Sequence, residues 1–218
     1  MLERLLPAFG TTVASVPKSP EDPHIPPLPV QQWRDDLVEA FSVMKPPPDS
    51  VYATRRANRE SGGKRVAGAF AVLAHHPDLT RAFLSFNRHV LYHNTLGERL
   101  LELVVMRVAL LRGSEYEWAE HAAVARELGF SEEQIDAVAI GPSAEGLSTI
   151  EALLLRAVDE LRHDSVFSAD TWSRLTEHLD TRQIIDLLFT VGAYDTLAVA
   201  FNCFGLEVDP DLQDSALP

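Results

Sequence analysis

The sequence of 218 residues contains a single cysteine, Cys203. An internal disulfide and a Cys-x-x-Cys redox pair are therefore both excluded. Positive charge is also scarce, because 19 lysine and arginine residues face 32 aspartate and glutamate residues and leave a formal net charge of −13. Nucleic acids attract clustered lysine and arginine, so this charge balance argues against nucleic-acid binding.

Long apolar segments are absent as well. The longest one, residues 100–111, contains Glu102 and Arg107 and is much shorter than a bilayer span. The N-terminus reaches Pro7 before any apolar core segment forms, so no signal peptide is expected. The composition, 46% hydrophobic and 23% charged, is typical of a globular protein. We therefore expect a cytoplasmic protein that does not bind a membrane.

Proline, in contrast, is concentrated near the N-terminus, where ten of the 14 prolines lie within the first 48 residues. Because proline fixes φ and removes a backbone donor, residues 17–29 are predicted to form an extended arm. Such an arm is either disordered or wrapped over a neighbouring surface. Apolar residues from Trp33 to Met44 recur at helical spacing and predict one short helix over about 29–44. We assign residues 1–48 to this proline-rich arm.

The rest of the chain has a helical pattern, without any sustained strand-like alternation. Capping-box patterns at Thr95, Ser114 and Ser131 mark three of the expected helix starts. The sequence therefore predicts an all-α domain over 49–208 and a tail over 209–218. Its helices are expected near 78–91, 95–111, 114–129, after Ser131, 146–163, 168–178 and 180–202.

Residues 98–128 and 181–204 also resemble each other faintly. In each segment an acidic residue lies in an apolar run, and a glycine (Gly113 or Gly192) and then a tyrosine follow. Either a duplicated helical hairpin or chance explains this similarity.

Polar residues within these helices indicate a candidate site. Glu102 and Arg107 interrupt the apolar run, and burying such groups is costly unless they are paired or used. A helix that begins at Ser114 carries Ser114, Glu117 and His121 on one face. Its N-terminal amides favour anions. A hydroxyl, a carboxylate and an imidazole are therefore expected to point the same way.

This pattern resembles the carboxymuconolactone decarboxylase and alkylhydroperoxidase-D-like superfamily. In the peroxidase branch of that family, a glutamate, eleven intervening residues and then Cys-x-Tyr-Cys-x3-His relay protons to a redox disulfide. Glu102, Tyr116 and His121 match the glutamate, the tyrosine and the histidine, whereas Ser114 and Glu117 stand in place of the two cysteines. The resemblance implies an alkylhydroperoxidase-D-like bundle of helical hairpins. It also implies dimers, trimers or hexamers with sites near subunit interfaces.

The missing cysteines change the expected chemistry. Thiol peroxidase activity needs a thiolate and a resolving thiol, so it is not expected here. The decarboxylase branch works without cysteines or cofactors, which implies that this chain needs no cofactor. Under this hypothesis Arg107 orients a substrate carboxylate, His121 or Glu117 moves a proton, and Glu102 holds His121 in the required tautomer. The expected catalytic set, without a metal, is Glu102, Ser114, Tyr116, Glu117 and His121.

The same residues also permit structural explanations. Ser114 and Glu117 alone form a capping box, Glu102 and Arg107 suit an ion pair between helices, and Tyr116 suits packing. The pair His89 and His93 has the spacing of a helical metal site, to which Glu117 and His121 would add further ligands. A basic cluster is either a solvated face or a route for an anionic substrate, and it comprises Arg55, Arg56, Arg59, Lys64 and Arg65.

Three functions therefore remain open. The first is a cofactor-free acid–base enzyme that performs decarboxylation, proton transfer or lactone chemistry on a small carbonyl or carboxylate compound. The second is a peroxidase-related antioxidant protein without the cysteine pair. The third is a non-catalytic oligomeric binding protein. We expect a small-molecule substrate and a homo-oligomer, since helical hairpins of this size expose long apolar faces.

Overall fold

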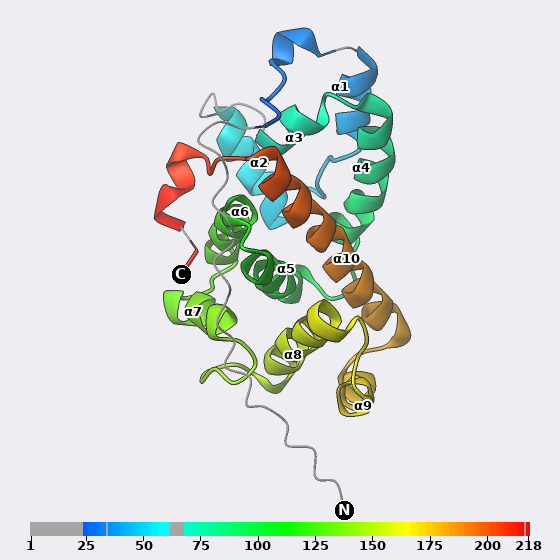
Figure 1. Ribbon diagram of the computed structural model, residues 1–218, viewed down its shortest axis with the longest axis vertical. Helices are drawn as coiled ribbons and strands as arrows, with labels where there is room; N and C mark the ends of the chain where they lie inside the picture. Colours follow the sequence, from blue (N-terminus) through cyan, green and yellow to red (C-terminus); the bar gives the residue numbers. More distant parts are fainter. Residues whose placement is uncertain (1–23, 34, 62–67, 216) are drawn as a thin grey trace, which may run out of the picture.

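A computed structural model of the chain describes residues 24–33, 35–61, 68–215 and 217–218, and the regular structure of these residues is entirely helical (Figure 1). The predicted all-α fold is confirmed. In chain order the elements are η1 (Val30–Gln32), α1 (Asp35–Ser42), α2 (Val51–Ser61), α3 (Gly68–Leu73), α4 (Pro77–Tyr92), α5 (Glu98–Arg112), α6 (Glu115–Glu127), α7 (Glu132–Ile140), α8 (Thr149–Asp164), α9 (Ala169–His178), α10 (Thr181–Phe204) and η2 (Pro210–Ser215).

Helix α5 lies at the centre of the bundle, with α6, α7, α8 and α10 packed around it (Figure 1). Residues 101–109 are all buried. A helix that is buried on every side has no polar face, which explains why the sequence here is apolar all round. Its two charged residues, Glu102 and Arg107, must consequently find partners inside the protein.

The turn between α5 and α6 sets the geometry of the candidate site. Gly113 adopts the left-handed conformation with φ of 60°, which a residue with a side chain adopts at a cost. The Ser114 amide donates back to the Ala109 carbonyl oxygen at 2.9 Å and thereby ends α5. The chain reverses within two residues, so α6 returns along α5 and brings His121 beside Glu102.

Two of the three predicted capping boxes are wrong. The N-cap of α5 is Gly97, and Thr95, two residues earlier, instead donates both its amide and its hydroxyl to Asp186, at 2.7 and 2.6 Å. Ser114 is the N-cap of α6, but its side chain makes no capping hydrogen bond. The box at Ser131 is confirmed.

The helix expected over 180–202 is confirmed as α10, one continuous helix of 24 residues that passes through Gly192, so the alternative of a duplicated helical hairpin is wrong. The similarity to residues 98–128 is therefore not a structural repeat. By length and composition alone α10 could cross a membrane, and it is the one such helix among the described residues. More than half of its apolar window is packed inside the bundle, as in the core helix of a globular domain.

Residues 1–23, about half of the predicted proline-rich arm, lie outside the described residues. The part that follows packs on its own chain, because the Leu28 amide donates to the Ala71 carbonyl oxygen at 2.9 Å and the His75 ring contacts the Pro26 carbonyl oxygen at 2.9 Å. It leads into the short helix α1, which packs on α4. In the predicted basic cluster, residues 64 and 65 lie outside the described residues, as does the side chain at position 59.

Helix α10 and the adjoining part of α4 expose several large apolar side chains, among them Phe86, Ile185, Leu188 and Phe189. The rings of Phe86 and Phe189 meet edge to face at 6.1 Å beside a shallow groove of about 420 Å³. Homo-oligomerisation, which would cover such a face, stays a prediction.

Candidate functional site

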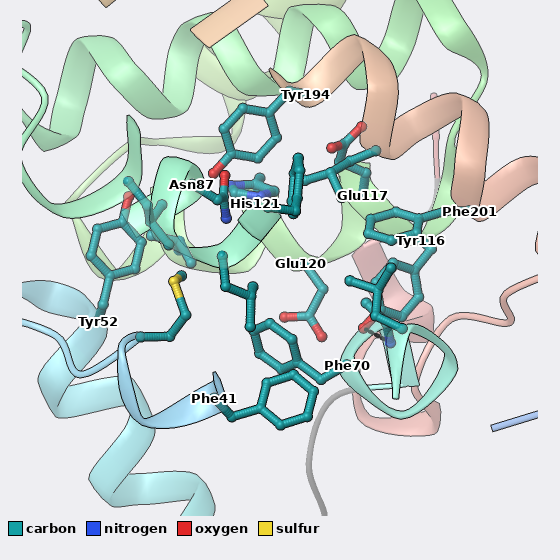
Figure 2. A pocket seen from close by; sticks show the side chains of 18 of the residues that line it. Phe41, Tyr52, Phe70, Asn87, Tyr116, Glu117, Glu120, His121, Tyr194 and Phe201 are labelled. Atoms are coloured by element: carbon teal, nitrogen blue, oxygen red, sulfur yellow. Dashed lines mark hydrogen bonds between the residues drawn. The ribbon is translucent and has the colours of Figure 1, made fainter. Parts of the chain in front are cut away.

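A cavity of about 390 Å³ lies between α4, α6 and α10, with further walls from α1, α2 and α3 (Figure 2). This volume falls within the usual range for small-molecule sites. Most of the lining is apolar, as such sites commonly are. The polar or ionisable side chains of the lining are Tyr52, Arg55, Arg56, Asn87, Tyr92, Tyr116, Glu117, Glu120, His121 and Tyr194.

The central feature of the site is a hydrogen-bonded pair formed by Glu102 and His121. Glu102 is completely buried, and its Oε2 lies 2.7 Å from Nδ1 of His121. The Tyr52 hydroxyl donates to Oε1 of the same carboxylate. Because a carboxylate only accepts hydrogen bonds, Glu102 fixes the proton of the neutral imidazole on Nδ1. Nε2 is then the unprotonated nitrogen, available to a ligand in the cavity.

Two tyrosines flank this pair. The rings of His121 and Tyr194 meet edge to face, 5.1 Å apart, and the Tyr194 hydroxyl points towards His121 and Asn87 (Figure 2). Burial raises the pKa of Tyr194 well above its usual value, and the nearby carboxyl groups of Glu102 and Glu117 raise it further. Burial and Glu102 act in the same way on the pKa of Tyr52. Both phenols are therefore stable hydrogen-bond donors at neutral pH.

Glu117 contributes a buried acid to the same wall. Both carboxyl oxygens are buried without a hydrogen-bond partner in the described part of the chain. Burial raises the pKa of Glu117 well above its usual value, and the negative charge of Asp195 adds to this effect. Asp195 itself is held by Arg112, which donates to both of its oxygens. The environment of Glu117 thus favours the neutral carboxylic acid.

The structure brings most of the predicted catalytic residues together. His121, Glu117 and Tyr116 line the cavity, and Glu102 supports His121 from behind. Tyr116 serves as a wall, because its hydroxyl accepts a hydrogen bond from the Ala69 amide at 3.3 Å. Ser114 is fully buried at the start of α6 and does not line the cavity.

Arg107, predicted to bind substrate, lies outside the cavity. Its Nε and Nη2 donate to the two carboxylate oxygens of Asp159, at 2.7 and 2.9 Å. Its Nη1 donates to the carbonyl oxygens of Val138 and Ala139, at 3.0 and 2.8 Å. All of these contacts join α5 to α7 and α8. The alternative ion pair with Glu102 is not formed either, because Glu102 faces His121.

Several polar residues of the site, Asn87 and Tyr52 among them, were not predicted from the sequence. Asn87 lies on the buried face of α4 in line with Thr80 and Leu84, so a polar residue at core spacing was a usable signal. Its Oδ1 has no hydrogen-bond partner in the described residues. Tyr52 reaches Glu102 from α2, 50 residues away in sequence, and no local pattern indicates it.

The predicted metal alternative finds no support in the part of the chain that the structure describes, where no group of three histidine, cysteine, aspartate or glutamate residues could hold an ion. Nε2 of His89 is hydrogen-bonded to Asp186 at 2.8 Å instead. Cys203 is exposed on α10 and does not line the cavity.

Comparison with known proteins confirms the predicted resemblance. The model of the carboxymuconolactone decarboxylase family matches residues 77–160, which run from α4 into α8 and include Glu102 and His121. No curated protein is significantly similar to the chain in sequence.

Solved structures confirm the alkylhydroperoxidase-D-like fold. The alkylhydroperoxidase AhpD core of an uncharacterized peroxidase-related protein from Ralstonia eutropha JMP134 matches with a TM-score of 0.64 and 18% identity, over 78% of this chain and 90% of that one. An uncharacterized peroxidase-related protein from Silicibacter sp. TM1040 matches with a TM-score of 0.64 and 14% identity, over 84% and 97%. A protein of unknown function from Agrobacterium tumefaciens matches with a TM-score of 0.58 and 19% identity, over 63% and 94%. At these identities the likeness shows a shared fold.

Proposed function

We propose that this chain, whose α4–α8 region matches the carboxymuconolactone decarboxylase family, is a cofactor-free acid–base enzyme. It would transfer a proton at a carbon atom beside a carbonyl group of a small molecule bound in the cavity. The observation that carries the proposal is the contact of 2.7 Å between Glu102 and Nδ1 of His121, because it leaves Nε2 as a base at the wall of a mainly apolar cavity.

In this proposal Nε2 of His121 takes a proton from carbon, and the bonding electrons move into the carbonyl group as an enolate. The negative charge that develops on the carbonyl oxygen is stabilised by neutral donors, for which the Tyr194 hydroxyl and the Asn87 amide are suited. Glu102 stabilises the imidazolium that forms. The imidazolium then returns its proton to the same or another carbon of the ligand, which completes an exchange or an isomerisation. General base catalysis of this kind contributes about 10²–10⁴-fold to a rate.

Proton transfer is favoured here over decarboxylation of a small acid. Decarboxylation needs a cation that orients the substrate carboxylate, and Arg107 is bound to Asp159 outside the cavity. Loss of CO₂ from a ligand leaves a carbanion that must be protonated at carbon, and Nε2 of the neutral His121 carries no proton to donate. The test described next separates the two reactions by their products.

The proposal is tested by incubating the protein in D₂O with ketones, unsaturated lactones and keto acids and following deuterium incorporation by NMR. His121→Gln should slow exchange into an accepted compound at least about 100-fold, because it removes the base. His163→Gln is the matched control, since His163 is an exposed histidine on α8, far from the cavity lining. Equal exchange rates in wild type and His121→Gln would contradict the proposal. Release of CO₂ would identify a decarboxylase.

A second candidate function is peroxide metabolism, which is favoured by the fold shared with two peroxidase-related proteins. A thiol route would depend on Cys203, which is exposed and lies outside the cavity lining. Consumption of an organic hydroperoxide that survives Cys203→Ser and is lost in His121→Gln would support this candidate over proton transfer.

A further inference from the structure

The far side of the cavity from His121 is an aromatic wall formed by Trp33, Phe41 and Phe70. The rings of Trp33 and Phe41 lie 4.8 Å apart and are inclined by 31°, and those of Phe41 and Phe70 meet edge to face at 5.3 Å. The indole nitrogen of Trp33 donates to the Leu28 carbonyl oxygen at 3.0 Å, so its polar atom is already engaged. The aromatic wall therefore offers a ligand only apolar ring surface.

This wall is a property of the present chain rather than of the matched family region. Trp33 follows η1, Phe41 lies in α1 and Phe70 lies in α3, all of which precede residues 77–160. Phe41 and Phe70 lie on the opposite side of the cavity from His121, Asn87 and Tyr194 (Figure 2). A ligand whose polar end meets His121 thus directs its other end at the aromatic wall.

The charges around the cavity decide which ligands fit. Arg55 is the arginine of the lining that is mostly buried, and two carboxylates already hold it, Glu120 at 3.0 Å and Glu127 at 2.8 Å. Arg56, the other arginine of the lining, is exposed at the surface. At the His121 end the nearest fixed charge is the buried carboxylate of Glu102. A carboxylate ligand would lose its hydration there, and among the described residues the lining holds no lysine and no arginine other than Arg55 and Arg56, so this loss is costly.

We infer that the cavity selects a neutral ligand with an apolar, ring-sized body that packs on the aromatic wall and one carbonyl group that faces His121. For the chemistry of the carbonyl end, this inference rests on the proposed function. The natural ligand class is therefore cyclic or aryl-substituted ketones and their neutral relatives. Small hydrophilic keto acids and other free carboxylates are excluded.

The experiment measures dissociation constants by isothermal titration calorimetry with 2-tetralone, a neutral bicyclic ketone, and with 2-naphthoate, a carboxylate of similar ring size. We expect 2-tetralone to bind at least about tenfold more tightly than 2-naphthoate. Phe41→Ala should weaken 2-tetralone binding about tenfold, through the loss of ring contacts. The matched control is Phe86→Ala, because Phe86 does not line the cavity but lines the neighbouring groove of α4 and α10, which shares only Phe83 with the cavity. It should leave the dissociation constant unchanged.

Phe41→Leu, which keeps an apolar side chain, repeats the test if Phe41→Ala unfolds as judged by circular dichroism. The inference is overturned if 2-tetralone does not bind, if 2-naphthoate binds as tightly, or if the Phe41 and Phe86 variants behave alike. Failure of the proposed function gives a different result: 2-tetralone binds with the expected dependence on Phe41, but deuterium enters its carbon atoms beside the carbonyl group no faster than without the protein.

Discussion

Replacing Glu102 with glutamine should change the tautomer of His121. The wild-type carboxylate accepts from two donors at once, Nδ1 of His121 at 2.7 Å and the Tyr52 hydroxyl. A glutamine amide offers only one acceptor oxygen, and its nitrogen is a donor. Since the Tyr52 hydroxyl still needs an acceptor in this buried place, the amide oxygen should face Tyr52 and the amide nitrogen should face His121. The imidazole then presents an unprotonated Nδ1 and carries its proton on Nε2.

The size of the effect follows from the contact that is removed. A hydrogen bond to a charged group is worth about 1.5–3 kcal/mol, and each 1.4 kcal/mol is about a tenfold change in an equilibrium. Glu102 should therefore favour the Nδ1-protonated tautomer by about 10- to 100-fold, so that the other tautomer stays below about 10% of the neutral form. In Glu102→Gln the Nε2-protonated tautomer should become the major one.

The assay is a long-range ¹H–¹⁵N NMR correlation of ¹⁵N-labelled histidine side chains at about pH 8, with the His121 signals assigned from His121→Gln. Tyr52→Phe is the matched control, because it removes the other donor but keeps the carboxylate, so the wild-type tautomer should persist. Deuterium exchange into an accepted ketone should fall about 10²–10⁴-fold in Glu102→Gln, since Nε2 can no longer take a proton. An unchanged tautomer in Glu102→Gln would refute the assigned role of Glu102.

Three further predictions concern buried charges. Burial and the charge of Asp195 raise the pKa of Glu117 in the folded protein. As the pH is raised, the Glu117 carboxyl group therefore loses its proton in the unfolded chain before it does so in the folded protein, and the free energy of unfolding falls above about pH 4.5. Glu117→Gln should consequently raise the melting temperature more at about pH 8 than at about pH 5, and an equal difference at both pH values would contradict this. Arg107→Met should lower the free energy of unfolding by about 3 kcal/mol, as measured with urea, because Asp159 and two carbonyl oxygens lose their partner; ketone binding by calorimetry should not change. Burial raises the pKa of Asp186, but hydrogen bonds from Thr95 and His89 outweigh it and leave the pKa below its usual value. Asp186→Asn should therefore cost about 1–3 kcal/mol in urea denaturation at neutral pH, and the cost should shrink as the pH falls through that lowered pKa.

Local patterns were sufficient to predict much of this fold. Helices α4 to α10 follow from apolar periodicity and from side chains that satisfy the first backbone amides. Ser131 is an example, since its hydroxyl accepts from the Gln134 amide at 3.3 Å, a contact between near neighbours. The pairing of Glu102 with His121 came from the resemblance and from their place in an antiparallel helical hairpin, again a short-range relation of 19 residues.

Contacts between distant residues account for the errors. Thr95 lies two residues before Gly97, the N-cap of α5, and its amide and hydroxyl donate to Asp186, which lies 91 residues further along the chain. Arg107 cannot serve a ligand because Asp159, 52 residues away, holds its guanidinium group. Gly192 does not interrupt α10, because the residues on both sides of it pack against other helices. In each case the competing partner is supplied by the tertiary fold, which no local pattern encodes.

The replacement of the cysteine pair has a chemical consequence for His121. One helical turn before His121, where the resemblance would place a thiol, α6 carries Glu117, a buried carboxyl group whose environment favours the neutral acid. Ser114, at the other cysteine position, is equally buried and does not line the cavity. Among the described residues His121 therefore has no thiol in the cavity lining to activate. If the imidazole, still oriented by Glu102, acts as a base, the proton that it removes comes from the bound ligand or from a water molecule rather than from a cysteine.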